Sequence, residues 1–556
     1  MTEPALPRDE DRPSAFSPPP SVVNHVPPAA TPSTPPPRGG SMGRTVGGGM
    51  SWMLVATVVS KLATSVTQLL LGWWLLPEHF AKFAIATTIA GFLMLAKDAG
   101  IPNYLIKQGS EKYPAISGPA FWMCAVYNTA AAALMALAAW PVAHYLYKDD
   151  ALAPMLWVMA FALPLGTPAA VLQAKLRLDL RFKQFSMLMS FSIIMRQVLT
   201  IVLAAMGFEA LSLALPVVFT AVLDSLAAWW MCNDRPWKRP ALFDSWGRLM
   251  SSTKWLINGT VGSFSSEWGP YLVLGRMVDH TITGYYFFAY QITAQIGMLL
   301  SFNLHVVLLP VLAKLNNEPA RQREAFVRVL TGLTLVGSYF SLAAAVVMAP
   351  LESLLWHGKW SPAVIAVVIF GIFYPWRVSF AVTCGLLMAQ GRFKRFSLSA
   401  WAEGLVLIGV TIVTCLYTSE LWIIALSNGL ALIFTRLAVT MHTFRLCGVS
   451  LTRLAPSMVY GWLVSVIAAA PFFWLDRSPM WAELTSWFIR ILPVTRVRPE
   501  LLAQSATDVL RILLAGSGFT LLFVILTRLA LSKDVSDAVA MLPARVRGAA
   551  KRLLAL

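Results

Sequence analysis

The sequence has few charged residues. Asp, Glu, Lys and Arg make up 13% of its 556 residues, about half of the share that a soluble domain carries, whereas 57% of the residues are hydrophobic. This balance excludes a soluble enzyme of several domains. The formal net charge is +17, but the basic residues lie between long apolar runs. They therefore indicate membrane orientation and not a nucleic-acid partner.

The sequence also lacks the motifs of several kinds of site. It has no GxxxxGK[ST] phosphate-binding loop and no HExxH metal motif. Its five cysteines are far apart, so neither a disulfide framework nor a zinc site is supported. We expect no enzyme activity and no bound cofactor. The main enzyme alternative, a membrane glycan polymerase or ligase, would be expected to carry a larger external loop.

The first 48 residues differ from the rest. Twelve prolines fall between Pro4 and Pro37, and glycines follow them. Such a segment cannot bury enough apolar area to fold, so we expect a disordered cytoplasmic tail over residues 1–48. The PxxP spacing within Pro32–Arg38 allows an alternative, a docking element for a partner. The segment has no apolar core of the kind found in a cleaved signal peptide.

From Met50 onward, apolar runs of bilayer-spanning length follow one another. We count fourteen, which predicts an all-α polytopic membrane protein. The second run is short, and glycines interrupt the seventh. The runs are Met50–Leu76, Ala81–Ala96, Phe121–Tyr145, Ala151–Gln173, Phe185–Met206, Ala210–Met231, Leu249–Leu274, Ile282–Leu312, Phe326–Met348, Pro362–Ala389, Phe396–Tyr417, Leu421–Phe444, Pro456–Leu475 and Val509–Leu529.

Basic residues divide unevenly between the two sides of these spans. When residues near the ends of the runs are counted with the adjoining gaps, the N-terminal tail, the even-numbered gaps and the C-terminus together hold 31 of the 44 Lys and Arg residues, and the odd-numbered gaps hold 8. Cytoplasmic loops carry the excess of Lys and Arg, so we expect both termini in the cytoplasm. The external loops are short except Asp476–Asp508, where Trp481, Leu484, Trp487 and Phe488 recur at helical spacing. This spacing predicts a helix lying in the membrane interface.

Two pieces of sequence recur at nearly equal distances. Arg181–Ser186 (RFKQFS) resembles Arg392–Ser397 (RFKRFS), 211 residues later, and Leu69–Ile89 aligns without gaps on Leu272–Ile292, 203 residues later. Each match falls at the same place in a six-span unit. Because six is even, the two units insert in the same orientation. We expect them to be related by a pseudo-two-fold axis along the membrane normal, with the pathway between them.

The repeat predicts how the chain is divided. The expected parts are a tail over 1–48, an N-terminal six-span bundle over 49–232, a C-terminal six-span bundle over 249–446, two extra spans with an external interfacial segment over 455–530, and a basic cytoplasmic tail over 531–556.

Several stretches resemble bacterial polysaccharide flippases of the multidrug/oligosaccharidyl-lipid/polysaccharide exporter superfamily. They are Leu75–Ala86 followed by Ala99–Gln108, Leu274–Val278 followed by Gly284–Gln291, and Arg177–Lys183. The resemblance covers about Met50–Leu446. The chain departs from the family pattern at Glu267–Pro270, where an Asn/Asp-rich stretch is usual, and in its Pro-rich tail.

The resemblance implies a transporter of the bacterial inner membrane. It would move an undecaprenyl-diphosphate-linked oligosaccharide from the inner to the outer leaflet by alternating access, for exopolysaccharide, capsule or O-antigen assembly. The implied partners are this lipid-linked substrate, the bilayer, and a polysaccharide polymerase with its export machinery. A small-molecule exporter of the same superfamily is the alternative within transport.

One face of the first run is polar. Thr57, Lys61, Thr64 and Gln68 follow one another at i, i+4, i+7 and i+11, and such a stripe should face protein or a water-filled cavity. A buried cation costs about 2.5–3.5 kcal/mol on insertion scales. Ammonium and guanidinium groups suit phosphate oxygens, so we predict a cationic cavity for the diphosphate. The alternative is that some of these cations pair with carboxylates. The candidate cations are Lys61, Arg196, Arg276, Arg377 and Arg436.

Polar residues of other spans complete the candidate site. Three intramembrane carboxylates could couple transport to protons, sodium or the membrane potential, or could serve as structural partners of the cations. They are Asp224, Glu267 and Glu403. The eighth run carries residues that could line a sugar path, although an interface belt would also explain its tyrosines. They are Tyr285, Tyr286, Tyr290, Gln291 and Gln295.

Overall fold

The computed structural model describes residues 39–241, 246–295, 318–453, 455–491 and 499–540. Among these residues there is no strand, so the described chain is all-α, as the sequence predicts. The α-helices are α1 (Gly39–Trp74), α2 (Pro77–Gln108), α3 (Tyr113–Pro141), α4 (Leu152–Leu165), α5 (Thr167–Leu178), α6 (Phe182–Ala205), α7 (Leu211–Cys232), α8 (Trp246–Met277), α10 (Pro319–Trp356), α11 (Ser361–Phe373), α12 (Pro375–Ala389), α13 (Phe393–Tyr417), α14 (Leu421–Leu446), α15 (Gly461–Asp476), α16 (Met480–Ile491) and α17 (Pro499–Ala540).

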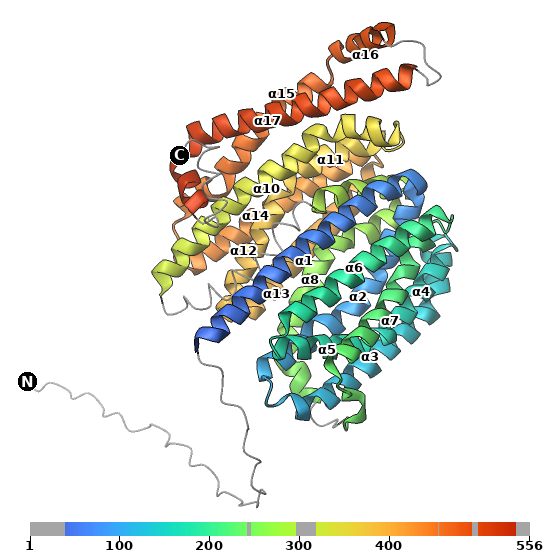
Figure 1. Cartoon of the computed structure of the whole chain (residues 1–556), viewed down its shortest axis with the longest axis vertical. Helices are drawn as coiled ribbons and strands as arrows, with labels where there is room; N and C mark the ends of the chain where they lie inside the picture. The colour runs from blue at the N-terminus through green and yellow to red at the C-terminus, as the bar shows by residue number, and fades with distance from the viewer. Residues whose placement is uncertain (1–38, 242–245, 296–317, 454, 492–498, 541–556) are drawn as a thin grey trace, which may run out of the picture. The chain divides into compact units, whose positions relative to one another are not determined.

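Most of the helices fall into two groups. We call α1–α7 the N-lobe, and α8–α14 with the helical segment 280–295 the C-lobe. In the N-lobe, α6 packs against α7, and α4 packs against α3 and α7; in the C-lobe, α13 packs along α8, and α11 packs between α10 and α14. The lobes meet where α2 packs along α8. Figure 1 shows how the two groups are arranged.

The two copies of the sequence repeat share a broken fourth helix. α4 and α5 meet at a bend of 46°, and α11 and α12 meet at a bend of 42°. Pro168 and Pro375 lie at the start of the second half of each pair. Proline lacks the N–H that a continuous helix requires, but it fits the first turn of a new helix. The continuous runs predicted at Ala151–Gln173 and Pro362–Ala389 are therefore bent pairs.

Both broken helices end in the same turn. In the first copy, Leu180 has a φ of 56°, and the N–H of Arg181 donates to the backbone oxygen of Leu176 at 2.9 Å. In the second copy, Gly391 has a φ of 70°, and the N–H of Arg392 donates to the corresponding oxygen at 2.8 Å. The repeated sequence RFKxFS thus follows a repeated turn.

The seventh predicted span is not interrupted. α8 is one helix from Trp246 to Met277, and Gly259, Gly262 and Gly269 lie against α13. A Cβ atom on Gly262 would lie 2.8 Å from the backbone nitrogen of Trp401. Small residues at this position let two membrane helices approach closely, so the glycines serve packing and do not break the helix.

The number of spans is not fixed by the structure. Eight described helices are long and apolar enough to cross a membrane, and the two bent pairs raise this number to as many as ten. Fourteen spans therefore stay a prediction. The eighth run beyond residue 295 lies outside the described residues, as do the PxxP segment and the tail beyond residue 540.

Two helix ends differ from the predicted boundaries. α1 begins at Gly39, inside the predicted tail, and α17 extends to Ala540, beyond the last predicted run. Extending a helix costs much less free energy than nucleating one. A helix that forms in an apolar span can therefore continue into the flanking polar sequence.

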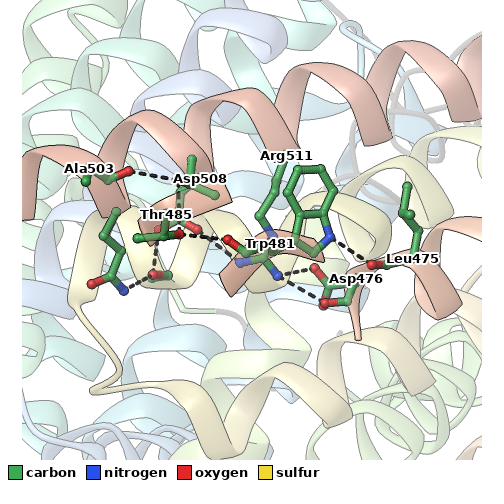
Figure 2. Close-up of polar contacts among 10 residues, drawn as sticks. Leu475, Asp476, Trp481, Thr485, Ala503, Asp508 and Arg511 are labelled. Carbon is green, nitrogen blue, oxygen red and sulfur yellow. Dashed lines mark hydrogen bonds and ion pairs between the residues drawn. The ribbon is translucent and has the colours of Figure 1, made fainter. Parts of the chain in front are cut away.

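The last three helices form an accessory group beside the C-lobe. α15 and α17 pack on α10, and α16 packs on α17 (Figure 1). Figure 2 shows the polar cluster that joins them: Arg511 of α17 forms ion pairs with Asp476 at the end of α15 and, at 3.1 Å, with Asp508. The indole N–H of Trp481 donates to the backbone oxygen of Leu475 at 2.8 Å. A helix is therefore present where the sequence predicts one in the Asp476–Asp508 segment.

Candidate functional site

The polar face of α1 lies against α6. The side-chain amide of Gln197 donates to Oγ1 of Thr64 at 3.2 Å, and the hydroxyl of Ser190 donates to the backbone oxygen of Ala56 at 3.3 Å. Thr64, one residue of the polar stripe of the first run, thus faces protein. The exposed apolar residues on other faces of α1 are Val58, Val59, Leu62 and Val66.

Five charged side chains connect the two lobes. Lys61 of α1 lies within electrostatic range of Glu267 on α8 and of Arg196 on α6. Arg196 in turn lies within range of Asp224 on α7. Glu267 forms an ion pair with Arg377 of α12, with 3.1 Å between Oε2 and Nη2. We call these five residues the charge series. Three are cations and two are carboxylates, so the series carries one excess positive charge.

Arg196 points away from the lipid-facing side of α6. The exposed apolar residues Met187, Phe191, Val198 and Val202 share one face of this helix. At 100° per residue, Arg196 lies about 140° around the helix from Phe191. Its side chain is nevertheless exposed, so Arg196 is not sealed within the N-lobe.

Arg436 and Glu403 have a different environment. They form an ion pair inside the C-lobe, and their side chains are only 2% and 0% exposed. The guanidinium carbon of Arg436 lies 3.7 Å from the centre of the Phe380 ring. Of the two interpretations made from the sequence, this geometry fits a structural pair and not a cation open to a substrate. We call it the sealed pair.

The other predicted residues are scattered. Arg276 is exposed at the end of α8, away from the charge series, Gln291 is half-buried, and Gln295 is buried. Gln68 is half-buried on α1, and its side-chain nitrogen has no hydrogen-bond partner among the residues that the structure describes.

A small polar chamber lies inside the C-lobe next to the charge series. Its volume is about 40 Å³, and Glu267 and Arg377 line it together with Tyr286, Tyr290 and Asn428. A pocket for a small organic ligand is about ten times larger, whereas a space of this size holds one or a few water molecules. Tyr286 and Tyr290 thus line a water-sized space, and a sugar path along the tyrosines of the eighth run stays a prediction.

One end of the lobe boundary is closed by hydrogen bonds from the C-lobe to the end of α1. The indole N–H groups of Trp356 and Trp360 donate to the backbone oxygens of Leu69 and Gly72 at 3.1 and 3.0 Å. The ammonium of Lys359 donates to the oxygens of Gly72 and Trp73, each at 3.0 Å. The carbonyls of Gly72 and Trp73 lie in the last turn of α1, where helix carbonyls lack an intrahelical partner, and a cation is favoured at a helix C-terminus.

We call these contacts the outer cap, because the sequence predicts this end to be external. Burial lowers the pKa of Lys359 below its ordinary value. Three donors of one lobe thus cap a helix of the other, and they can be released only if the lobes separate there.

Packing and charge reinforce the outer cap. Phe80 of α2 lies edge-on to Trp360 and Phe288, with ring centres 5.3 and 5.8 Å away. Asp149 of the N-lobe lies 3.2 Å from Nζ of Lys82 and 3.5 Å from Nδ1 of His280 in the C-lobe. Aromatic packing and a cross-lobe contact between His280 and Asp149 therefore close the same end.

The outer cap was not predicted from the sequence. Residues His357–Trp360 form a short turn that contains a basic and an aromatic residue. This composition could have indicated a loop that contacts another part of the chain. The partners of Trp356 and Trp360 are 287 and 288 residues away in the chain, and no local pattern identifies them.

Comparison with known proteins agrees with this architecture. Residues 70–365, just over half of the chain, match the family described as "Polysaccharide biosynthesis protein". The succinoglycan biosynthesis transport protein ExoT of Rhizobium meliloti (strain 1021) is 23% identical over 329 residues, which are 58% of this chain and 64% of that relative. The matched region thus spans less than two thirds of the relative's length.

Two solved structures share the fold. Lipid II flippase MurJ, in an inward closed conformation, has a TM-score of 0.59 at 15% identity, covering 84% of this chain and 98% of that chain. An inward-facing multidrug resistance MATE family transporter of the MOP superfamily has a TM-score of 0.54 at 13% identity, covering 72% and 99%. The resemblance to polysaccharide flippases that the sequence predicts is confirmed, and so is the fold class.

Proposed function

Because the chain belongs to the polysaccharide biosynthesis protein family, we propose that it carries an undecaprenyl-diphosphate-linked oligosaccharide across the bacterial inner membrane. The proposed direction is from the inner to the outer leaflet, for the assembly of exopolysaccharide, capsule or O-antigen. One relative is named a succinoglycan biosynthesis transport protein, and one structure of the same fold is named a lipid II flippase. Both names support this class of substrate.

The observation that carries the proposal is the charge series at the lobe boundary, next to a closed outer end. Lys61 and Arg196 offer ammonium and guanidinium donors, which bind diphosphate oxygens well. The C-lobe chamber is too small for a sugar. The oligosaccharide therefore occupies the space between the lobes, while the polyprenyl chain stays in lipid.

The outer cap gives the mechanism its second step. With the outer end closed, the substrate enters from the cytoplasmic side; the lobes then rock, and the bonds from Trp356, Lys359 and Trp360 to α1 break. The glycan leaves outward, where a polymerase and its export machinery take it up. The energy comes from a proton or sodium gradient or from the membrane potential. Asp224 and Glu267 are the carboxylates placed to take part, because Glu403 is committed to the sealed pair.

Reconstitution tests this function. The full chain is placed in vesicles containing a polyprenyl-diphosphate-linked oligosaccharide in both leaflets, and a glycosidase is added outside. We expect the digestible fraction to rise from about half toward completion, and empty vesicles to remain at half. An unchanged fraction, together with uptake of lipid-free cationic dyes, would support the small-molecule exporter instead.

The proposed orientation has its own test. Both termini and the loop that contains Ser245 are expected in the cytoplasm, and α16 outside. An impermeant thiol reagent added to intact cells should label Ser486→Cys and not Ser245→Cys. The reverse pattern would overturn the orientation.

A further inference from the structure

The turn that carries the outer cap is held by a buried carboxylate. Glu352 lies about one turn before the end of α10 and is 4% exposed, and its Oε1 accepts the backbone N–H of Trp360 at 2.8 Å. Between these two residues the chain reverses at His357 and Gly358, whose φ angles are 52° and 91°. A hydrogen bond to an ionised acceptor is about twice as strong as a neutral one. Glu352 therefore fixes where Trp360 lies after the turn.

Trp360 transmits this position to the other lobe. Its indole N–H donates to the backbone oxygen of Gly72 on α1 at 3.0 Å, and the residue is fully buried. The indole ring is stacked on Phe288, with 3.8 Å between the ring centres and 14° between the planes. A ring packed this closely cannot follow a shifted backbone without losing its contacts. The hydrogen bond to Gly72 therefore depends on the hydrogen bond to Glu352.

The next residue along α10 joins the same helix end to the accessory group. The hydroxyl of Ser353 donates to Oδ2 of Asp508 on α17 at 2.6 Å and accepts from the side-chain amide of Gln504 at 3.0 Å. Asp508 is 1% exposed, and Arg511 lies 3.1 Å from its other carboxylate oxygen (Figure 2). The backbone oxygen of Ser353 accepts the N–H of His357, the first residue of the turn, at 3.2 Å. α17 thus holds the end of α10 from which the turn starts.

The fold alone does not require a charge at Glu352. Within the described part of the chain, the ammonium of Lys359 in the same turn does not pair with this carboxylate and donates instead to the oxygens of Gly72 and Trp73. Burying a carboxylate without a cation is costly, and a glutamine of the same shape would accept the N–H of Trp360 at a lower cost. The stronger acceptor favours a role in holding the outer cap closed.

We propose that Glu352 is a positioning residue of the outer cap and that the accessory group steadies it through Ser353. Glu352 acts on α1 through Trp360. The helices α15–α17 lie outside the two six-span units of the repeat, and this arrangement gives them a function, because they set how readily the outer end opens. The role in transport rests on the proposed function, whereas the opening of the cap can be measured without substrate.

The test measures opening at the outer end of the full chain in nanodiscs. Spin labels on Leu76→Cys and Glu420→Cys, exposed positions on the two lobes, report their separation by electron paramagnetic resonance after the native cysteines are replaced by alanine. Glu352→Ala should raise the ratio of open to closed distances about tenfold, and Glu352→Gln, which keeps an acceptor oxygen, should raise it less. Ser353→Ala should raise it about threefold, and Ser338→Ala, which loses a hydrogen bond only within α10, should leave it unchanged.

A double variant separates positioning from a general loss of stability. Trp360→Phe removes the indole N–H and so the hydrogen bond to Gly72. Adding Glu352→Ala to Trp360→Phe should then change the ratio by less than about threefold, whereas two independent effects would multiply. A full tenfold effect in the Trp360→Phe background would overturn the proposal, as would an unchanged ratio in Glu352→Ala of normal melting temperature. If Glu352→Ala does not accumulate, an unchanged ratio in Glu352→Gln decides against it.

The accessory group and the proposed function fail in different ways. An unchanged ratio in Ser353→Ala would overturn the part assigned to α15–α17. If the distances respond to Glu352→Ala but the wild type does not move lipid-linked oligosaccharide in vesicles, the proposed function is wrong and the positioning role stands. If the wild type moves it and the distances do not respond, only the role of Glu352 is lost.

Discussion

Two Arg–Glu pairs that each join different helices of the C-lobe look alike in the sequence and differ in their surroundings. Arg436 and Glu403 are almost completely buried, and the guanidinium is stacked on Phe380. Arg377 and Glu267 are partly exposed, beside a water-sized chamber and within reach of Lys61. The comparison teaches that the exposure of an intramembrane charged side chain, and not its residue type, decides whether it can take part in transport.

The largest expected effect comes from breaking the sealed pair. Arg436→Met leaves the Glu403 carboxylate buried without a partner, which should cost about 3–5 kcal/mol of folding stability. We expect low membrane abundance and a lowered melting temperature in detergent. The double variant Arg436→Met with Glu403→Met should recover most of the stability, since a packed apolar pair replaces a buried ion pair at little cost. Normal abundance of the single variant would show that the pair is not sealed.

A smaller loss of stability should follow from breaking the open pair. Arg377→Gln removes a charged hydrogen bond worth about 2 kcal/mol, and the partly exposed Glu267 can still be hydrated. We expect near-normal abundance with strongly reduced export, measured as lipid-linked oligosaccharide retained in the inner leaflet. A stability loss as large as that of Arg436→Met would remove the distinction between the two pairs.

The smallest effect on stability is expected at the outer cap. Lys359→Gln removes a cation from the end of α1, worth about 1 kcal/mol. The change should shift the protein toward the outward-open state without unfolding it. Thiol labelling from outside at Phe80→Cys, which packs against Trp360, should become faster when Lys359→Gln is added. An unchanged labelling rate would show that the ammonium does not hold this end closed.

Part of this account was predictable from the sequence. Hydropathy predicted the helical fold, and the spacing of Thr57, Lys61 and Thr64 predicted one polar side of α1; the structure adds that Thr64 lies against α6. The helix α16 followed from the spacing of Trp481 and Trp487. Periodicity works for these features because each depends on one segment and its surroundings.

Other features depend on the meeting of distant segments. Glu403 and Arg436 lie on successive spans, but only packing shows that they face each other with no open space between them. The hydrogen bond from Trp360 to Gly72 joins residues 288 positions apart. Tryptophan side chains and backbone carbonyls are common, so the sequence alone does not identify these two as partners. The bend at Pro375 was visible as a proline within an apolar run, which our count of continuous spans passed over.

The central claim is that Lys61 binds the diphosphate through its charge. The most direct measurement compares Lys61→Arg, Lys61→Ala and Lys61→Glu for the amount of lipid-linked oligosaccharide retained in the inner leaflet, with membrane abundance and melting temperature measured beside it. We expect Lys61→Arg to keep much of the export, Lys61→Ala to lose most of it, and Lys61→Glu to be inactive, all at normal abundance. Normal export by a normally abundant Lys61→Ala protein would contradict the claim.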